Sequence, residues 1–125
     1  MGIRFDKALD IHPEALAMRA QRTKILASNI ANENTPGYQA RDIDFSASLQ
    51  RAQGDLADGF GAGAGADLDA GQALYRVPNH PSQDGNTVEL GVEQAAFSQN
   101  ASDFQTSLTF LNMKLKGLAK AISGQ

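Results

Sequence analysis

Two histidines and one pair of aspartates are the residues of this chain that come nearest to a catalytic or metal-binding pattern. His12 and His80 lie far apart in the sequence, and each stands next to a proline. Because a metal site normally needs three or four ligands, we expect both histidines at the surface, in a loop or at a helix start. Asp42 and Asp44 lack a nearby constellation of Ser, His and Lys with which to perform acid–base catalysis. We expect these two carboxylates to face solvent.

Two glycine-containing segments resemble ligand-binding loops only in part. Residues 59–63 (GFGAG) are not followed by the Lys-Ser/Thr pair of a phosphate-binding loop, and no strand precedes them. In residues 67–71 (DLDAG) the glycine falls one position too early for a calcium loop, and no glutamate closes the segment. The chain has no cysteine, which excludes disulfides and thiolate metal sites. The sequence therefore predicts no enzyme, no cofactor and no metal.

The charge pattern argues against two further classes of partner. The 11 basic and 14 acidic residues give a net charge of −3 without any Lys/Arg run, whereas nucleic-acid binding normally requires a concentrated basic face. Lys114, Lys116 and Lys120 form the one basic cluster, at the end of a predicted helix, where cations complement the helix dipole. No run of 18 apolar residues exists, and the N-terminus carries acids in place of an apolar core. We expect neither a membrane span nor a cleavable signal peptide.

The elements of the fold are predicted by apolar residues that recur every three and four positions at both ends of the chain. This spacing is typical of helices that pack lengthwise in a left-handed supercoil. We expect one helix over about residues 3–33, with Pro13 in its first turn, and another of about thirty residues from near Val92. The residues of the expected assembly seam are Leu16, Ala20, Ala27, Ile30, Phe97, Phe104, Leu108, Leu111, Leu115, Leu118 and Ile122.

Between the two helices the sequence predicts a corner and a few short elements. Pro36 followed by Gly37 suits a type II turn with a positive φ at the glycine. Residues 38–45 are expected to be extended and residues 46–53 to form a short helix. Residues 54–71 are expected to be a flexible linker, because they are rich in Gly and Ala and poor in bulky apolar side chains.

The remaining middle segment predicts two short strands, at residues 74–77 and 87–90, around a turn at Asp84 to Asn86. The predicted fold is therefore mainly α, with long N- and C-terminal helices packed as an antiparallel coiled-coil pair and a small β/loop insertion between them. The chain divides into an N-terminal helical segment of the core (1–34), the turn, strands and loop (35–90), and the C-terminal helix of the core (91–125).

Residues 26–38 (LASNIANENTPGY) resemble the signature of bacterial flagellar rod, hook and related axial proteins. That signature runs SN(I/L)AN, two variable residues and then TPGY. Residues 39–45 (QARDIDF) are similar to the proximal rod proteins rather than to the longer distal rod or hook proteins, and residues 84–90 and 107–111 point the same way. The residues expected to shape the corner within this motif are Asn29, Asn32, Thr35, Pro36, Gly37 and Tyr38.

The resemblance implies a structural subunit of the proximal rod of the flagellar basal body. Such a subunit self-assembles with other rod proteins through its terminal helices into a hollow shaft that transmits motor torque. The implied partners are copies of itself, other rod proteins, the basal-body MS ring or its rod adaptor, and the flagellar type III export apparatus. The implied location is the rod in the periplasmic space, reached by export without a cleaved signal peptide.

Two other classes of protein fit parts of the pattern. A soluble helical adaptor or export chaperone would carry the same seam, but we would expect it to be a stable dimer at low concentration. A rod subunit should instead be partly disordered alone, because a seam between distant chain ends closes at a large loop-entropy cost. An enzyme would require detectable turnover or metal binding, for which the sequence provides no residue constellation.

Overall fold

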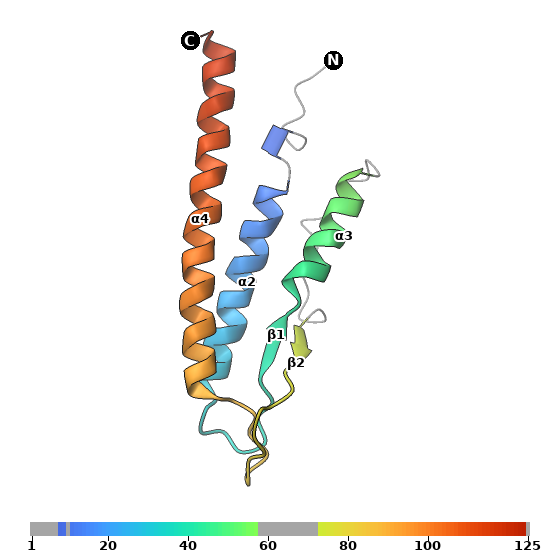
Figure 1. Ribbon diagram of the computed structural model, residues 1–125, viewed down its shortest axis with the longest axis vertical. Coiled ribbons are helices and arrows are strands. Elements are labelled where there is room, and N and C mark those ends of the chain that lie inside the picture. The colour runs from blue at the N-terminus through green and yellow to red at the C-terminus, as the bar shows by residue number, and fades with distance from the viewer. Residues whose placement is uncertain (1–7, 10, 58–72, 125) are drawn as a thin grey trace.

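The computed structural model describes residues 8–9, 11–57 and 73–124. They form a narrow, elongated bundle in which the start of the first long helix and the end of the last one point toward one end, and the turns at residues 32–40 and 76–89 lie at the other (Figure 1). The elements in chain order are α2 (His12–Ala31), β1 (Arg41–Ile43), α3 (Phe45–Ala57), β2 (Ala73–Tyr75) and α4 (Leu90–Ser123). Among the described residues, no helix is both long enough and apolar enough to cross a membrane.

The helices α2 and α4 lie side by side and run in opposite directions (Figure 1). Helix α4 has 34 residues and is therefore about 50 Å long. It extends well past the start of α2, which has 20 residues. The prediction of a helix at each end of the chain is thus confirmed, and α4 begins two residues before the expected Val92. The part of the expected first helix at residues 3–7 and 10 lies outside the described residues.

Local sequence signals account for the ends of these helices. Pro13 lies in the first turn of α2, where its missing N–H and fixed φ are tolerated. Gly37 has a φ of 73°, and the Tyr38 N–H donates to the Thr35 carbonyl at 3.3 Å. These two observations confirm the predicted turn. Gly124, with a φ of 71°, ends α4 and donates its N–H to the Lys120 carbonyl.

A two-stranded antiparallel sheet and α3 lie beside the helical pair. Strand β1 pairs with β2 in a register that places Arg41 opposite Tyr75. Helix α3 then begins at once, because the Asp44 carboxylate accepts the Ala47 N–H at 3.0 Å and its carbonyl accepts the Ser48 N–H.

The structure corrects three expectations about this middle region. Phe45 belongs to α3 and not to an extended segment, since Asp44 starts the helix there. Residues 54–57 also belong to α3, and residues 58–71 of the expected linker lie outside the described part. Residues 87–89 form no strand: Thr87 donates its N–H to the Tyr38 carbonyl, but the Ala40 N–H donates to the Thr87 hydroxyl and not to a backbone carbonyl.

The interior of the described region is small and unusually polar. Buried apolar residues are Ala15, Met18, Leu26, Ala40 and Ile43, and buried polar residues are Asn29, Ser48, Asn86, Glu93 and Asn100. Fully buried polar side chains cost free energy unless they are hydrogen-bonded. Their partners therefore decide how the elements fit together.

Candidate functional site

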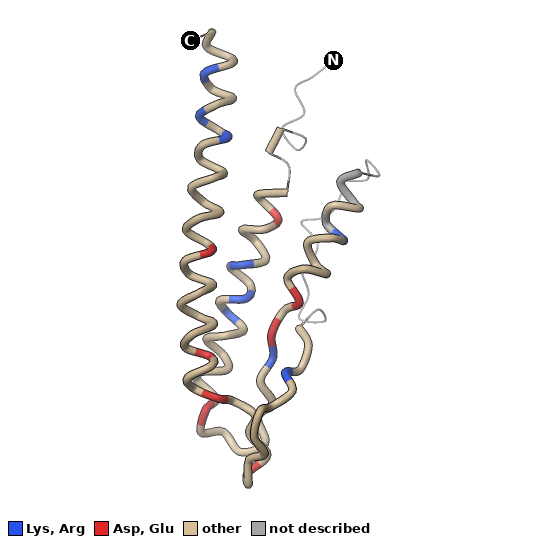
Figure 2. Tube along the Cα trace, in the orientation of Figure 1, with Lys and Arg blue, Asp and Glu red and all other residues tan. Residues whose placement is uncertain are grey.

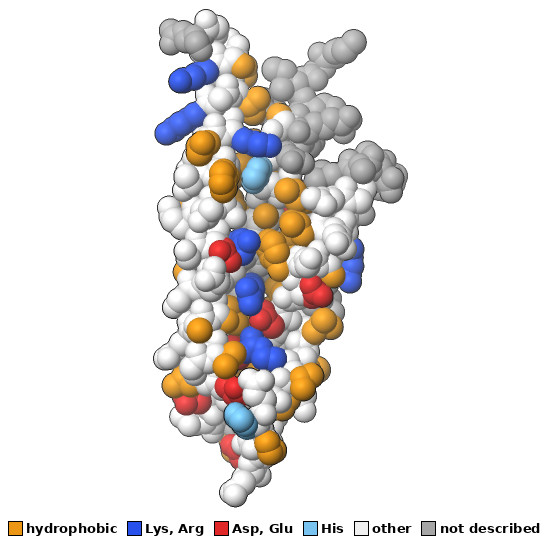
Figure 3. Space-filling view, viewed as in Figure 1, with side chains coloured by type: hydrophobic (Ala, Val, Ile, Leu, Met, Phe, Trp, Pro, Cys, Tyr) orange, Lys and Arg blue, Asp and Glu red, His pale blue; other side chains and the backbone are white. Residues whose placement is uncertain are grey.

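Five polar side chains, carried by α2, β1, α4 and the residue that follows β2, meet where α2, the sheet and the first turn of α4 converge. We call this cluster the polar junction; its members are Arg22, Asn29, Asp42, Arg76 and Glu93. Basic and acidic side chains are interspersed along the middle of this face of the molecule (Figure 3). The junction joins segments up to 64 residues apart in sequence.

Asp42 on β1 lies at the centre of the charged part of the polar junction. The Arg22 guanidinium binds both of its oxygens, at 2.8 and 2.9 Å, and Arg76 donates to Oδ2 at 2.9 Å. The Ile43 N–H also donates to Oδ1 at 2.8 Å. Burial opposes ionisation of Asp42, but the hydrogen bonds from Arg22, Ile43 and Arg76 outweigh it and lower the pKa of this carboxyl. The hydrogen bond to Asp42 likewise raises the pKa of Arg22.

Glu93, in the first turn of α4, has no solvent exposure at all. One of its carboxylate oxygens accepts a hydrogen bond from Arg76, and the other accepts one from the Asn29 amide at 3.0 Å. The Arg76 guanidinium therefore bridges Glu93 on α4 and Asp42 on β1. A buried ion pair adds little net stability, but removal of one partner leaves an uncompensated buried charge. The two arginines and two carboxylates balance in charge.

Asn29, near the end of α2, uses all of its hydrogen-bonding capacity. Its amide nitrogen donates to the Arg41 carbonyl at 2.7 Å and to Glu93 at 3.0 Å. Its amide oxygen accepts from the Arg41 N–H at 3.1 Å and from the Tyr38 hydroxyl at 3.3 Å. The motif asparagine thus connects α2 to β1, to the turn and to α4.

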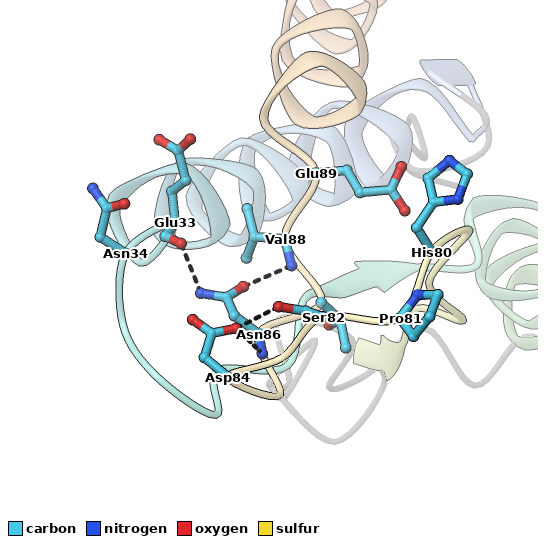
Figure 4. Close-up of a pocket in the computed structure, with 10 residues that line it drawn as sticks. Glu33, Asn34, His80, Pro81, Ser82, Asp84, Asn86, Val88 and Glu89 are labelled. Atoms are coloured by element: carbon cyan, nitrogen blue, oxygen red, sulfur yellow. Dashed lines mark hydrogen bonds between the residues drawn. The ribbon is translucent and has the colours of Figure 1, made fainter.

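A second asparagine, Asn86, binds backbone groups of the segment that follows α2. Its amide nitrogen lies within 2.9 Å of the carbonyl oxygens of Asn32, Glu33 and Thr35. Its oxygen accepts the Val88 N–H at 2.8 Å, and Figure 4 shows this bond and the one to Glu33. These carbonyls follow the end of α2, where backbone groups need partners outside the helix. Asn86 therefore attaches the segment that leads into α4 to the segment that leaves α2.

The two turns at this end of the molecule pack directly on each other. Gly37 donates its N–H to the Asp84 carbonyl at 2.9 Å. Gly85 has a φ of 77°, and a Cβ on it would lie 3.6 Å from the Gly37 Cα. The two turns thus meet glycine to glycine.

A shallow polar hollow of about 330 Å³ lies beside these turns (Figure 4). The carboxylates that line it include Asp84 and Glu89. A hydrogen bond from the Ser82 hydroxyl lowers the pKa of Asp84, and one from the Asn79 amide lowers the pKa of Glu89. Both carboxylates therefore already have partners, and no cluster suited to a metal ion occurs in the described part of the chain.

All residues of the expected seam lie on α2 or α4, but they differ in burial. Half-buried members are Leu16, Ile30, Phe97, Phe104, Leu108, Leu111 and Leu118; exposed members are Ala20, Ala27, Leu115 and Ile122. Among the motif residues, Asn29 is buried, Asn32 and Tyr38 are half-buried, and Thr35, Pro36 and Gly37 are exposed.

The two histidines and the three clustered lysines lie at separate places in the fold. His12 begins α2, and its ring stacks on Phe110 with centroids 6.3 Å apart, while His80 is exposed. Lys114, Lys116 and Lys120 are exposed toward the C-terminal end of α4 (Figure 2).

The expectation that Asp42 faces solvent is wrong, because it binds Arg22 and Arg76, whereas Asp44 is exposed. Sequence reasoning also missed Glu93 and Asn100 as buried residues and Arg76 as the half-buried residue that binds Glu93. One signal was available, since Glu93 and Asn100 are seven residues apart and so share one face of α4.

Comparison with known proteins places this arrangement in a class of structural proteins. A family model described as a flagella basal body rod protein matches residues 9–39, which hold α2 and the corner. A flagellar basal body rod protein FlgB of Cereibacter sphaeroides is 47% identical, over 97% of this chain and 98% of its own. FlgB of Salmonella typhimurium is 42% identical over 97% and 96%, and FlgB of Escherichia coli K12 is 40% identical over 95% of each chain. The chain belongs to the FlgB family of flagellar basal body rod proteins.

Proposed function

We propose that this chain is a structural subunit of the proximal rod, and that it assembles through its terminal helices with copies of itself and with other rod proteins. The observation that carries the proposal is the similarity to FlgB proteins over almost the whole of both chains. The described residues support a structural role, since their polar clusters hold elements together and the carboxylates of Asp42, Glu89 and Glu93 bind neighbouring side chains. The product is a hollow shaft that transmits motor torque.

The surface of α4 supports assembly through the terminal helices. Phe110, Met113 and Ile122 are 51%, 62% and 66% exposed. Phe110 lies beside the start of α2, where its ring stacks on His12. Met113 and Ile122 follow it in sequence, toward the end of α4 that extends past α2 (Figure 1). Exposed apolar surface of this kind is typical of interaction sites. Neighbouring subunits would bury it, together with the exposed seam residues Leu115 and Ala27.

In this proposal segments 1–34 and 91–125 form the core of the rod wall as a coiled-coil pair, and segment 35–90 is carried outside it. The polar junction gives this division a mechanical role. Because Arg76 and Asp42 attach the sheet to α4 and α2, a load on the outer segment passes to both core helices.

The proposal also specifies where the protein acts and what it meets. The subunit is exported through the flagellar type III apparatus without a cleaved signal peptide and joins the basal body in the periplasmic space. Its neighbours at the base are the MS ring or its rod adaptor. No enzymatic activity is part of the proposal.

The experiment that tests it is complementation of a strain lacking the chromosomal copy, with basal bodies then purified from it. A tagged chain should restore swimming and co-purify with basal bodies at a fixed ratio to other rod proteins. Restored swimming without the chain in washed basal bodies would contradict a rod subunit.

Circular dichroism with sedimentation of the purified chain separates the rod proposal from the adaptor. A monomer of low helicity would support terminal helices that order on assembly. A stable, fully helical dimer would favour an adaptor or export chaperone, which the comparisons do not favour.

A further inference from the structure

Asn100 is a fully buried polar residue in the middle of the contact between α2 and α4. Its side chain is 1% exposed. Its amide nitrogen donates to the Arg19 carbonyl at 2.9 Å and to the Thr23 hydroxyl oxygen at 2.8 Å. The Thr23 hydroxyl in turn donates to the Arg19 carbonyl, so both amide hydrogens of Asn100 have one specific pair of acceptors on α2.

The apolar residues of α4 do not distinguish one axial position of the helix from the next. Phe97, Phe104, Leu111 and Leu118 follow one another at intervals of seven residues, as do Leu108, Leu115 and Ile122. A slide of α4 by seven residues therefore replaces apolar side chains by apolar side chains. In helical pairs of this kind a single buried polar residue can select one register, at a cost in stability.

The polar contacts between the helices match in one register only. Glu93 on α4 contacts Asn29 on α2, and Phe110 on α4 contacts His12 on α2. The number of residues from Glu93 to Phe110 equals the number from His12 to Asn29, as one antiparallel register requires. The Asn100 contacts and the Arg19–Asp103 ion pair fall between these two ends.

We propose that Asn100 is a positioning residue that sets the axial register of α4 against α2. A slide of seven residues brings either Glu93 or Ser107 to the position of Asn100. Glu93 would place a carboxylate against the Arg19 carbonyl without a donor, which is unfavourable in a buried site. Ser107 has a single donor for two acceptors. Either slide also separates Asp103 from Arg19.

The amide oxygen of Asn100 explains why this role differs from simple stabilisation. It is buried and has no hydrogen-bond partner among the described residues. A leucine of similar volume would remove that unfavourable burial, so it should preserve or raise thermal stability while the register is lost. A merely structural residue would show the opposite result.

The test measures the register in the full chain with two spin labels. The chain has no cysteine, so Lys24→Cys and Lys116→Cys, at exposed positions on α2 and α4, provide unique attachment sites. Double electron–electron resonance, with excess unlabelled chain, reports the distance within one molecule. A slide of seven residues moves α4 by about 10 Å.

We expect one narrow distance distribution for the parent chain and for Asn112→Leu, the same change at an exposed position of α4. Asn100→Leu should add a population displaced by about 10 Å, with an unchanged or higher thermal midpoint. A single undisplaced distribution in Asn100→Leu would mean that the contacts of Glu93 in the polar junction, together with Asn86 and the turns, hold the register, and it would overturn the proposal. The distances are measured in trimethylamine oxide, because this osmolyte favours the folded state of a chain that we expect to be partly disordered alone. A broad distribution in the parent chain under that condition would overturn the proposal as well.

Thr23→Val is a second test of the proposal. It keeps the shape of the side chain on α2 and removes one of the two acceptors of the Asn100 amide. It should broaden the distribution by less than Asn100→Leu does. If Asn100→Leu fails to fold, as judged by circular dichroism, an unchanged distribution in Thr23→Val rejects the proposal and a displaced population supports it. The inference rests on contacts within one chain and does not depend on the proposed function.

Discussion

The side-chain amide of Asn29 pairs with the backbone of Arg41 as a neighbouring strand would. Its nitrogen lies 2.7 Å from the Arg41 carbonyl oxygen, and its oxygen lies 3.1 Å from the Arg41 nitrogen. The Arg76 N–H bonds to the Ala40 carbonyl on the side of β2, so the alternation of an antiparallel pair directs the groups of Arg41 away from β2. Asn29 on α2 therefore provides the hydrogen-bond partners for the backbone N–H and carbonyl of Arg41 at the free edge of β1.

Asn29→Ala should destabilise the chain strongly. The change leaves one oxygen of Glu93 without a partner in a buried site, and the Arg41 N–H and carbonyl without partners in a partly buried one. Unsatisfied buried groups cost about 1–3 kcal/mol each, and we expect a total loss of about 3 kcal/mol. Urea denaturation measures it, with the exposed Asn34→Ala as control. Equal midpoints for the two variants would remove Asn29 from its central role.

Asp42→Asn should change how stability depends on pH. The pKa of Asp42 is lowered in the folded chain, so its contribution is present above the unfolded value of about 3.9 and is lost as the pH falls through the folded value. The variant should be less stable at pH 7, and its free energy of unfolding should decline less steeply below pH 4. Urea titrations at several pH values check this, with the exposed Glu33→Gln as control. Identical slopes for Asp42→Asn and the parent would contradict the prediction.

Gly37→Val should disrupt the corner through backbone conformation and not through crowding. Gly37 has a φ of 73°, and no atom lies within 4 Å of a Cβ built on it. A β-branched residue in this conformation costs about 1–3 kcal/mol. Gly91→Ala, in the first turn of α4 and equally uncrowded, should instead stabilise the chain by about 0.5–1 kcal/mol. Thermal unfolding compares them, and wild-type stability and assembly of Gly37→Val would rule out a role for the turn.

Leu111→Asp should abolish assembly without making the monomer insoluble. Leu111 is half-buried on α4 among the seam residues, and a charge there opposes burial in any helix contact. Swimming in soft agar, together with the soluble fraction of the purified chain, measures both effects. The matched control is Asn112→Asp, which adds the same charge at the next, exposed position. Normal motility with Leu111→Asp would refute the seam assignment.

The elements with local causes were predictable from the sequence. Pro13 and Gly37 act through their own backbone conformations, so the start of α2 and the turn after it follow from short stretches of residues. The regular apolar spacing at both ends likewise predicted two helices. The flagellar signature in residues 26–38 led to the correct family without any structural information.

Only the tertiary structure decided what lies between the elements. The spacing of apolar residues indicates roughly which face of a helix is buried, but successive side chains point about 100° apart around the helix. The spacing therefore did not show that Asn100 is buried and Ala101 exposed. The partners of Asp42 lie 20 and 34 residues away, and no local pattern specifies such pairs. The sequence alone determined the helices, the corner and the family, because these depend on neighbouring residues; the tertiary structure decided which polar groups are buried together, because that depends on how distant segments meet.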